Sequence, residues 1–242
     1  MTQQQKVIFV TGGSRGVGKA IIDKFHDADW LTVACATNEN NFKTSNADLN
    51  LVCDIADKNC VKETIKKIIS KFGRLDAVVN NAGISGSILF NTEEEDDLWH
   101  RVIDVNLHGT YYVSKYSLPH LPNETGRIVN ISSVLGLKGV ADQAAYCSAK
   151  HGVIGLTKSL ALHLAKRRIT VNAICPGWIR TDMMQNRMQE LHASEAGLLS
   201  AIPLTRTIEP EEIAEMTWHL VASPATVNMT GQTITIDGGY LA

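Results

Sequence analysis

Near its start the chain reads Lys6-Val7-Ile8-Phe9-Val10-Thr11 and continues as Gly12-Gly13-Ser14-Arg15-Gly16-Val17-Gly18. The first run is apolar and rich in β-branched residues, which favours a buried strand, and the glycines allow a tight turn after it. Apolar residues then recur at helical spacing between Ala20 and Phe25. Strand, glycine turn and helix in this order predict a helix N-terminus whose free N–H groups and positive dipole end can bind a pyrophosphate. A glycine cluster can also serve the turn alone, so other segments have to distinguish these two interpretations.

The same alternation of short strands and amphipathic helices continues to the C-terminus. Strands separated by helices imply right-handed crossovers and a parallel sheet. No linker rich in Pro, Gly or Ser interrupts the 242 residues, so we expect one domain spanning residues 1–242. The predicted fold class is α/β, a Rossmann-type doubly wound parallel β-sheet flanked by helices on both faces. The expected strands are 6–11, 31–36, 48–54, 75–80, 127–131, 169–175 and 232–237, and the later helices are 61–72, 93–112, 146–166 and 211–221.

Composition excludes several classes of partner. With 44% hydrophobic and 20% charged residues and a formal charge of −2, the chain offers no electrostatic basis for binding nucleic acid or an anionic membrane. Residues Met1 to Lys6 are polar and lead directly into a short strand, so we expect neither a signal peptide nor a membrane span, and a cytoplasmic location.

The cysteines and histidines give no indication of a metal. Five cysteines without C-x-x-C spacing fit free thiols in a reducing compartment, and Cys35, Cys53 and Cys175 lie in apolar runs expected in the core. The eight histidines are scattered without paired ligand spacing. We therefore expect no metal site.

A candidate catalytic group follows the strand at 127–131. Tyr146 and Lys150 are four residues apart in a segment with helical character, so they share one face. A phenol ionises near pH ~10 unless a neighbouring positive charge favours the phenolate, and Lys150 is placed to supply that charge. Ser132 and Ser133 end the preceding strand, at the sheet edge where ligands bind in open α/β folds. Asn106 is a poor helix former in mid-helix, either satisfied within the core or placed at a kink where it could relay protons.

The end of the second strand indicates which dinucleotide would bind. An acidic residue there normally binds the ribose hydroxyls of NAD, but Ala36, Thr37 and Asn38 provide none, and the first acid is Glu39. Arg15 in the glycine turn could meet a 2′-phosphate. The pattern favours NADP(H).

A segment rich in methionine and leucine, residues 178–203, follows the strand at 169–175. Its apolar residues lie among polar ones, as in a mobile lid over an apolar pocket. An ordinary pair of surface helices fits the pattern equally well. The apolar residues are Met183, Met184, Met188, Leu191, Leu198 and Leu199.

Taken together, these motifs resemble the short-chain dehydrogenase/reductase family, and within it the β-ketoacyl-acyl-carrier-protein reductase group. They span nearly the whole chain in the family's order. The matching residues are Thr11-Gly12-x-x-x-Gly16-x-Gly18, Asp54, Asn80-Asn81-Ala82-Gly83, Asn106, Ser133, Tyr146-x-x-x-Lys150, Pro176-Gly177 and Asp237-Gly238-Gly239.

The resemblance implies a role for each catalytic residue. Tyr146 would protonate the carbonyl oxygen during reduction, with Lys150 lowering its pKa and holding the nicotinamide ribose. Ser133 would hydrogen-bond the substrate carbonyl, and Asn106 would hold a water of the proton relay. The implied cofactor-binding residues are Gly12, Ser14, Arg15, Gly16, Val17, Gly18, Thr37, Asp54, Ile55, Asn81, Ala82, Gly83, Tyr146, Lys150, Pro176, Gly177, Ile179 and Thr181.

The implied activity is reduction of a carbonyl, that of a 3-oxoacyl thioester, to a secondary alcohol with NADPH. Carrier-protein reductases commonly have a basic residue before the glycine that precedes the serine strand, whereas Glu124 and Thr125 precede Gly126 here, and Arg167 and Arg168 retain a second basic patch only. A small hydroxy acid, a sugar or another secondary alcohol is therefore an alternative substrate, and the acyl carrier protein an open partner. Some relatives sense NADP without turnover, but those usually lack the tyrosine or lysine.

The resemblance also implies a homotetramer, in which long helices and last strands pair across two-fold axes. The residues expected at these interfaces are Leu98, Val102, Val105, Tyr240, Leu241 and Ala242.

Overall fold

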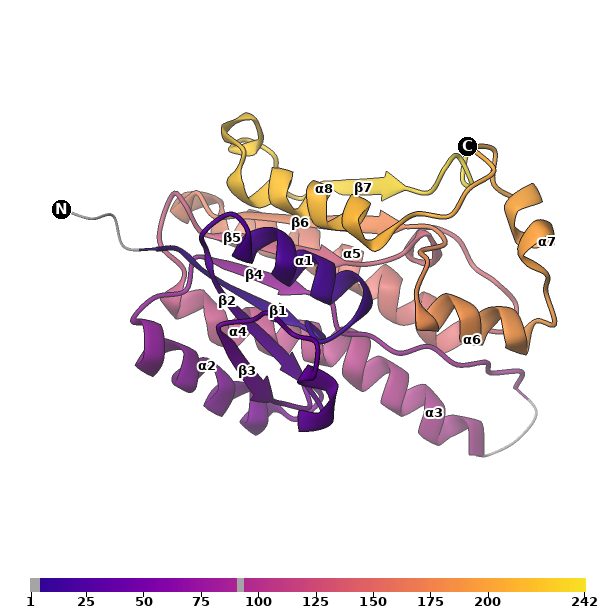
Figure 1. The fold of residues 1–242 in the computed structure, drawn as a ribbon, viewed down its shortest axis with the longest axis horizontal. Helices are drawn as coiled ribbons and strands as arrows, with labels where there is room; N and C mark the ends of the chain where they lie inside the picture. The colour runs from indigo at the N-terminus through magenta and orange to yellow at the C-terminus, as the bar shows by residue number, and fades with distance from the viewer. Residues whose placement is uncertain (1–4, 91–93) are drawn as a thin grey trace.

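The computed structural model describes residues 5–90 and 94–242, so the first four residues and Glu93, where a helix was expected to begin, lie outside it. Within the described residues, seven parallel strands form one sheet in the order β3-β2-β1-β4-β5-β6-β7. This confirms the predicted doubly wound α/β fold (Figure 1). The strands are β1 (Val7–Thr11), β2 (Leu31–Ala36), β3 (Leu49–Val52), β4 (Ala77–Asn80), β5 (Arg127–Ile131), β6 (Thr170–Pro176) and β7 (Thr233–Ile236).

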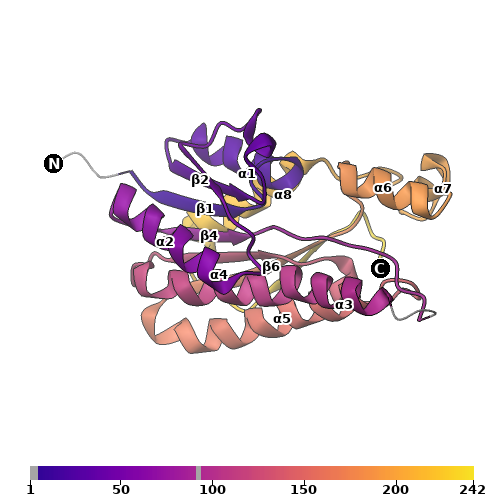
Figure 2. The same cartoon turned by 90° about the horizontal axis from the view of Figure 1, so that it is seen from below.

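Helices cover both faces of the sheet, as Figure 2 shows edge-on. Helices α1 (Gly16–His26) and α8 (Pro210–Ala222) pack together on one face. On the other face, α2 (Lys58–Phe72) packs on α4 (Thr110–Ser117), and α3 (Glu94–Ile103) packs on α5 (Ala144–Leu164). Two further helices, α6 (Asp182–Glu190) and α7 (Glu195–Ser200), project from the edge of the sheet (Figures 1 and 2).

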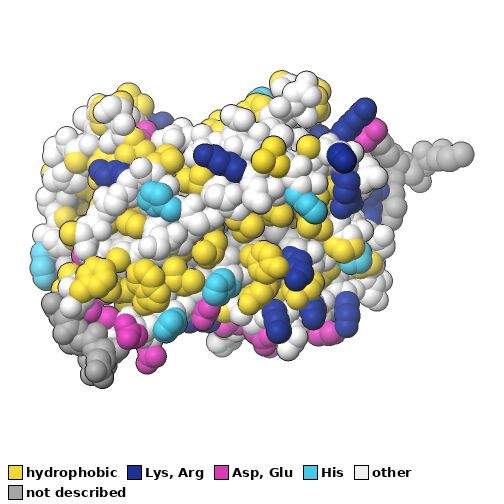
Figure 3. All heavy atoms as spheres, turned by 180° about the vertical axis from the view of Figure 1, so that it is seen from behind, with side chains coloured by type: hydrophobic (Ala, Val, Ile, Leu, Met, Phe, Trp, Pro, Cys, Tyr) yellow, Lys and Arg dark blue, Asp and Glu magenta, His cyan; other side chains and the backbone are white. Residues whose placement is uncertain are grey.

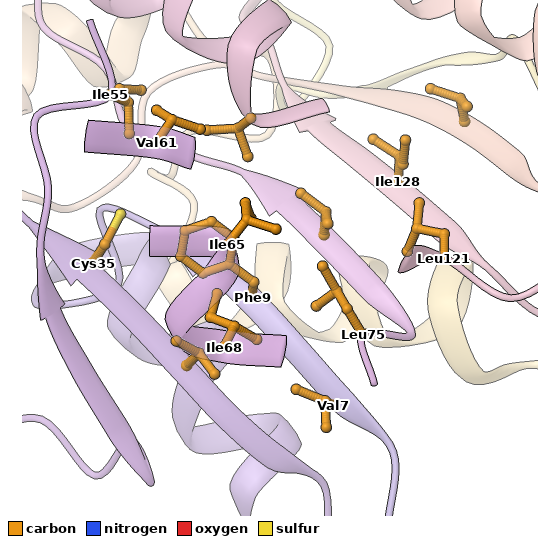
Figure 4. Close-up of a cluster of buried hydrophobic side chains, with 14 of the residues drawn as sticks. Val7, Phe9, Cys35, Ile55, Val61, Ile65, Ile68, Leu75, Leu121 and Ile128 are labelled. Carbon is orange, nitrogen blue, oxygen red and sulfur yellow. The ribbon is translucent and has the colours of Figure 1, made fainter. Parts of the chain in front are cut away.

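Two apolar cores lie above and below the sheet because successive residues of a strand point to opposite faces. In β1, Val7 and Phe9 enter the core shared with α2, while Ile8 and Val10 enter the core shared with α1 and α8. Figure 4 shows Phe9 among the first set, against Ile65 and neighbouring side chains. Each such side chain, fully buried, contributes about 1.5–3 kcal/mol to the free energy of unfolding. A central strand that is apolar on both faces is typical of a covered parallel sheet.

The strand order of the sheet reverses between β1 and β4. Strand β1 pairs with β2 on one side and with β4 on the other, so the crossovers after β1 and β4 leave the sheet in opposite directions. A crevice opens at such a point outside the carboxyl ends of the strands. The residues that follow β1, β4, β5 and β6 therefore meet at this edge.

The expected long helix over 93–112 is irregular at its centre. A π-helical turn, Asp104–Gly109, separates α3 from α4 and contains Asn106. Asn106 therefore lies in an irregular turn of the helix and is also buried, so both interpretations of this residue stay open. No helix among the described residues is both long and apolar enough to cross a membrane.

Candidate active site

The glycine turn after β1 has a shape that only glycine permits. Gly12 has a φ of +64°, and a Cβ on Gly18 would lie 2.1 Å from the carbonyl oxygen of Gly12. Helix α1 starts at Gly16 without a side-chain cap or an acidic residue in its first turn. Its first intrahelical bond is donated by Lys19 N to Arg15 O, 3.1 Å, so the preceding N–H groups point out of the helix end. These groups fit the phosphates of a dinucleotide.

Ser14 and Val17 of this turn are both buried, and the Val17 side chain belongs to the core beneath α1. Only the backbone of Val17 can therefore face a ligand at the helix end. The turn also touches the chain after β6, because a Cβ on Gly16 would lie 3.3 Å from Thr181 Cγ2.

The segment after β4 is fastened to the end of β1. Thr11 Oγ1 accepts hydrogen bonds from Asn81 N and Ala82 N, each 3.0 Å, and Asn81 Nδ2 donates to Thr11 O at 2.9 Å. Beyond Ala82 the chain passes between two catalytic candidates. A Cβ on Gly83 would lie 2.8 Å from Asn106 Oδ1 and 3.6 Å from Lys150 Nζ. The expected cofactor residues at the end of β4 thus adjoin the candidate catalytic residues.

Asn106 holds this segment with both ends of its amide. Its Oδ1 accepts from Ile84 N at 2.9 Å, and its Nδ2 donates to Ile84 O at 2.7 Å. The side chain is 1% exposed, so these bonds satisfy groups that would be costly to leave unpaired. The backbone carbonyl of Asn106 accepts from Thr110 Oγ1 at 2.8 Å, which occupies a carbonyl of the π-helical turn.

Ser133, Tyr146 and Lys150 converge where β5 ends beside α5. Lys150 Nζ donates to Ile131 O at 2.8 Å and lies 5.5 Å from the centroid of the Tyr146 ring. Ser133 Oγ accepts from Leu135 N at 3.1 Å, and its hydroxyl lies close enough to the Tyr146 phenol to influence the pKa of that phenol. The predicted arrangement of a phenol and an ammonium on one helical face, beside a serine at a strand end, is present.

Burial dominates the protonation of this pair. It raises the pKa of Tyr146 to about 12, although the neighbouring Ser133 hydroxyl acts in the opposite direction. Burial also lowers the pKa of Lys150 to about 8, since removal from water disfavours the ammonium. In the protein alone, burial and the Ser133 hydroxyl set the direction of the Tyr146 shift, so the expected lowering of the Tyr146 pKa by Lys150 stays a prediction.

The residues expected near the 2′-phosphate follow the neighbouring strands β1 and β2. Thr37 and Asn38 are exposed directly after β2, and Asn38 Oδ1 accepts from Asn40 N at 2.8 Å. Arg15 is exposed and faces Asp182, the first residue of α6, with Nη1 and Oδ2 3.7 Å apart. Sequence reasoning did not anticipate this acidic neighbour of Arg15.

Asp54 and Ile55 follow β3. Asp54 Oδ2 pairs with Arg101 Nη2 of α3 at 2.9 Å, a partner that sequence reasoning missed because it lies in another helix. Ile55 is buried against the π-helical turn, since a Cβ on Gly109 would lie 2.7 Å from Ile55 Cδ1. The absence of a side chain at Gly109 therefore lets the segment after β3 approach the segment that carries Asn106.

The segment after β6 closes the far side of the crevice. Pro176 ends the strand, and Gly177 N donates to Ile236 O at 2.8 Å. A Cβ on Gly177 would lie 3.1 Å from Asp237 Cα, so the absence of a side chain at Gly177 lets the chain pass close to Asp237. Ile179 then forms a parallel bridge with Ile208, which directs the chain into α6.

The thiols lie where expected. Cys35, Cys53 and Cys175 are free and buried, which confirms their assignment to the interior, and Cys147 is buried beside Tyr146 as well. Over residues 5–90 and 94–242, no cluster of His, Cys, Asp or Glu could hold a metal ion.

A family model described as Enoyl-(Acyl carrier protein) reductase matches residues 12–241, nearly the whole chain. The chain belongs to the short-chain dehydrogenase/reductase family. This short-chain dehydrogenase/reductase is 37% identical over 250 residues to the 3-oxoacyl-(acyl-carrier-protein) reductase FabG of Thermotoga maritima, covering 100% of both chains.

Two solved structures resemble this short-chain dehydrogenase/reductase along almost its entire length. One is a variant of the actinorhodin polyketide ketoreductase with NADPH, at a TM-score of 0.90 and 31% identity, covering 99% of each chain. The other is the ligand-free aldohexose dehydrogenase of Thermoplasma acidophilum, at a TM-score of 0.89 and 32% identity, covering 98% of this chain and 94% of that one.

In this short-chain dehydrogenase/reductase, one charged group near the site was missed from the sequence. Arg187 of α6 contacts Ser87 after β4 and Asp142 before α5, at 2.9 and 2.5 Å. These partners are 100 and 45 residues away in the chain. No spacing rule could have found them.

Proposed function

We propose that this protein reduces a carbonyl group, the 3-oxo group of an acyl thioester, to a secondary alcohol. NADPH supplies the hydride when it is bound. The observation that carries the proposal is the convergence of Ser133, Tyr146 and Lys150 at the sheet edge next to a glycine turn fit for a dinucleotide.

Tyr146 is the proton donor in this proposal. With a pKa of about 12 its phenol is protonated at neutral pH, so it can give a proton to the carbonyl oxygen as negative charge develops there. Ser133 Oγ already accepts from Leu135 N, which leaves its hydroxyl hydrogen free to donate to the same oxygen. The two donors would orient the carbonyl and stabilise the developing oxyanion.

Lys150 and Asn106 support this step. Lys150 Nζ is fixed by Ile131 O beside the phenol, where it can hold the nicotinamide ribose and favour the phenolate after proton transfer. Asn106 keeps the backbone at Ile84 in place and borders Gly83, from where it would hold a relay water. We propose that the other residues predicted to bind the cofactor, which follow strands β1, β2, β3, β4 and β6, hold the dinucleotide.

The proposed preference for NADPH over NADH rests on charge. Thr37 and Asn38, which follow β2, offer no carboxylate to bind ribose hydroxyls or to repel a 2′-phosphate. Arg15 offers a planar guanidinium suited to phosphate. Its exposed contact with Asp182 is weak enough to yield to a dianionic ligand.

We propose an acyl thioester as the substrate, with acyl carrier protein as one possible carrier of it, because reductases of that name are full-length relatives. The basic patch that could bind an acidic carrier protein, Arg167 and Arg168, is partly neutralised by neighbouring groups. Arg168 faces Glu124 at 3.3 Å, and Arg167 is bound to Asn123 and to the carbonyls of Leu118 and Leu121. We therefore expect coenzyme A thioesters to serve nearly as well as carrier-protein thioesters.

The test is NADPH oxidation with matched substrates. The same 3-oxoacyl group is presented on coenzyme A, on acyl carrier protein and on N-acetylcysteamine. Simple ketones are tested with NADPH, and aldohexoses are tested with NADP in the direction of oxidation. Thioester reduction at the highest kcat/KM supports the proposal. Preferential oxidation of an aldohexose would instead favour the second candidate, a sugar dehydrogenase, which the similarity to the aldohexose dehydrogenase supports. NADPH binding without turnover on any substrate would contradict both.

We also propose a homotetramer in the cytoplasm. Figure 3 views the molecule from the side of α5, where apolar side chains are exposed among charged ones. Tyr111 of α4 and Leu162 of α5 are 40% and 81% exposed. Val102 and Val105 are not available for an interface as expected, because they are 0% and 5% exposed and belong to the protomer's own core.

The five free thiols fit the proposed cytoplasmic location, which is a reducing compartment, and cell fractionation would test it.

A further inference from the structure

The expected lid over residues 178–203 contains α6 and α7, which have little apolar anchorage. Met184 is the buried residue of α6 and Leu198 that of α7. Both helices project from the body of the protein at the edge where the strands end (Figures 1 and 2). Because so little apolar area holds them, polar contacts must provide much of the attachment of α6.

Arg187 makes the least exposed of the ion pairs found for α6. Its Nη2 meets Asp142 Oδ2 at 2.5 Å, and its Nη1 donates to Ser87 Oγ and to Glu190 Oε2, both at 2.9 Å. The side chain is 11% exposed and that of Asp142 is 24% exposed. By contrast, Arg15 and Asp182 at the start of α6 are 78% and 70% exposed and 3.7 Å apart. We call these four residues, Arg187, Asp142, Ser87 and Glu190, the Arg187 network.

Two members of the network belong to the segments that hold the catalytic residues. Ser87 lies three residues after Ile84, whose backbone is bound by Asn106, and Ile88 N donates to Asp142 O at 2.8 Å. Asp142 lies just before α5 and four residues before Tyr146, which belongs to the first turn of that helix. A displacement of Arg187 would therefore free α6 from both walls of the site at once.

We propose that Arg187 is a positioning residue that holds α6 over the site through Asp142 and Ser87, and that it thereby determines affinity for substrates with a long acyl chain. The inference rests on the proposed function. A small ketone that reaches only Ser133 and Tyr146 does not need α6. A long acyl thioester extends beyond these residues and needs α6 to complete its binding surface.

The guanidinium suits this role because it donates to two acceptors in different directions at fixed angles. An ammonium at this position would reach one of the two at a time. The same geometry makes the network sensitive to loss of either partner, since a buried charge left unpaired destabilises the attachment of α6. Arg187→Lys should thus retain part of the effect, and Arg187→Met none.

The experiment compares Arg187→Met, Arg187→Lys and Asp142→Asn with Arg180→Met. Arg180 is a matched control because it is also a lid arginine with two carboxylate partners, Glu195 and Glu209, yet none of its recorded partners belongs to the Arg187 network. Steady-state kinetics use a medium-chain 3-oxoacyl coenzyme A and the small ketone ester ethyl acetoacetate, each with NADPH.

We expect Arg187→Met and Asp142→Asn each to raise KM for the thioester about tenfold, the equivalent of one charge-assisted contact. The kcat/KM for ethyl acetoacetate should stay within about twofold of wild type, and Arg187→Lys should fall between. A variant that combines Arg187→Met with Asp142→Asn should have a KM for the thioester no higher than the higher of the two single variants, because both changes remove the same interaction. Equal losses with both substrates, or Arg187→Met resembling Arg180→Met, would overturn the proposal.

A second readout separates this inference from the proposed function. Hydrogen exchange of the α6 amides in the protein without substrate should accelerate in Arg187→Met and Asp142→Asn, with α1 and α5 unchanged. Arg180→Met should leave the α6 rates at the wild-type level. Unchanged exchange in Arg187→Met would overturn the role of Arg187 whatever the substrate, whereas a protein without turnover but with accelerated exchange would overturn only the proposed function.

Discussion

Tyr146 differs from a solvent-exposed phenol because burial holds its proton more tightly. Replacing Tyr146 by Phe keeps the ring but removes the hydroxyl hydrogen. We expect kcat to fall by about 10²-fold or more, with the Kd for NADPH within about threefold of wild type. NADPH oxidation and NADPH fluorescence titration measure the two quantities. Ser133→Ala serves as a comparison that should lower kcat while leaving the phenol in place, and near-normal turnover of Tyr146→Phe would remove Tyr146 from the mechanism.

Lys150 makes the stability of the fold depend on pH. Its folded-state pKa of about 8 lies below its ordinary value of 10.5, so between these values the unfolded chain binds more protons. Stability should therefore rise with pH through this window, by about 2–3 kcal/mol between about pH 8 and pH 10. Lys150→Met should lack this rise.

Urea unfolding of wild type and Lys150→Met from about pH 7 to pH 10 measures the difference directly. The range stops there because Tyr146 acts in the opposite sense above pH ~10, where the unfolded phenol loses its proton first. Parallel curves for the two proteins would contradict the assignment of a strongly desolvated lysine.

Arg15 and Asp182 together should set the affinity for the 2′-phosphate. Asp182→Asn removes a carboxylate that lies 3.7 Å from Arg15 and would repel the phosphate. Because both groups are largely exposed, we expect only a two- to fivefold lower Kd for NADPH, roughly the range of an exposed ion pair.

Two measurements check this reading of the pocket. The Kd for NADH should not change in Asp182→Asn, since NADH lacks the phosphate. Arg15→Ala should raise the Kd for NADPH roughly ten- to hundredfold. An equal effect of Asp182→Asn on both cofactors would show that α6 moves rather than that a charge is lost.

At the scale of elements, two glycines have different roles. Gly18 belongs to the turn proposed to bind the dinucleotide, whereas Gly155 lies inside a packed helix. Gly18→Ala would place a Cβ 2.1 Å from the Gly12 carbonyl oxygen, so the start of α1 must shift. We expect loss of cofactor binding and a lower Tm. Gly155 lies in the middle of α5 with open space around it within one protomer, and Gly155→Ala should raise the free energy of unfolding of the protomer by about 0.5–1 kcal/mol because alanine favours the helix. Thermal unfolding with and without NADPH distinguishes the two, and similar effects of both changes would contradict the packing described for Gly18.

At the scale of the whole molecule, α5 exposes apolar surface that one protomer does not cover. Leu162 is 81% exposed on this helix, the longest described here. If protomers associate through α4 and α5, Leu162→Glu places charges at the interface and should shift sedimentation toward smaller species. Val52→Glu on the edge strand β3 is the control, since Val52 is 45% exposed at the far edge of the sheet. A wild-type protein that sediments as a monomer at micromolar concentration would contradict the tetramer.

The sequence by itself determined the order of elements and the choice of Tyr146 and Lys150 as the candidate catalytic pair. Strand and helix each impose a local period, and a turn with positive φ requires glycine, so these features can be predicted from neighbouring residues. Tyr146 and Lys150 are one helical turn apart, which fixes them on one face without any knowledge of the fold. Asn106 was singled out for a local reason as well, because asparagine is a poor helix former in mid-helix, and a π-helical turn contains it.

Only the tertiary structure decided what each group meets and how much water it loses. Val102 and Val105 were assigned to an interface because helical periodicity shows an apolar face but not its partner, and here that face packs within the protomer. Arg187 meets Asp142 and Ser87 across 45 and 100 residues, distances over which no sequence period acts. Burial raises the pKa of Tyr146, and burial depends on every element packed around the ring, while the sequence reveals only the nearest charge.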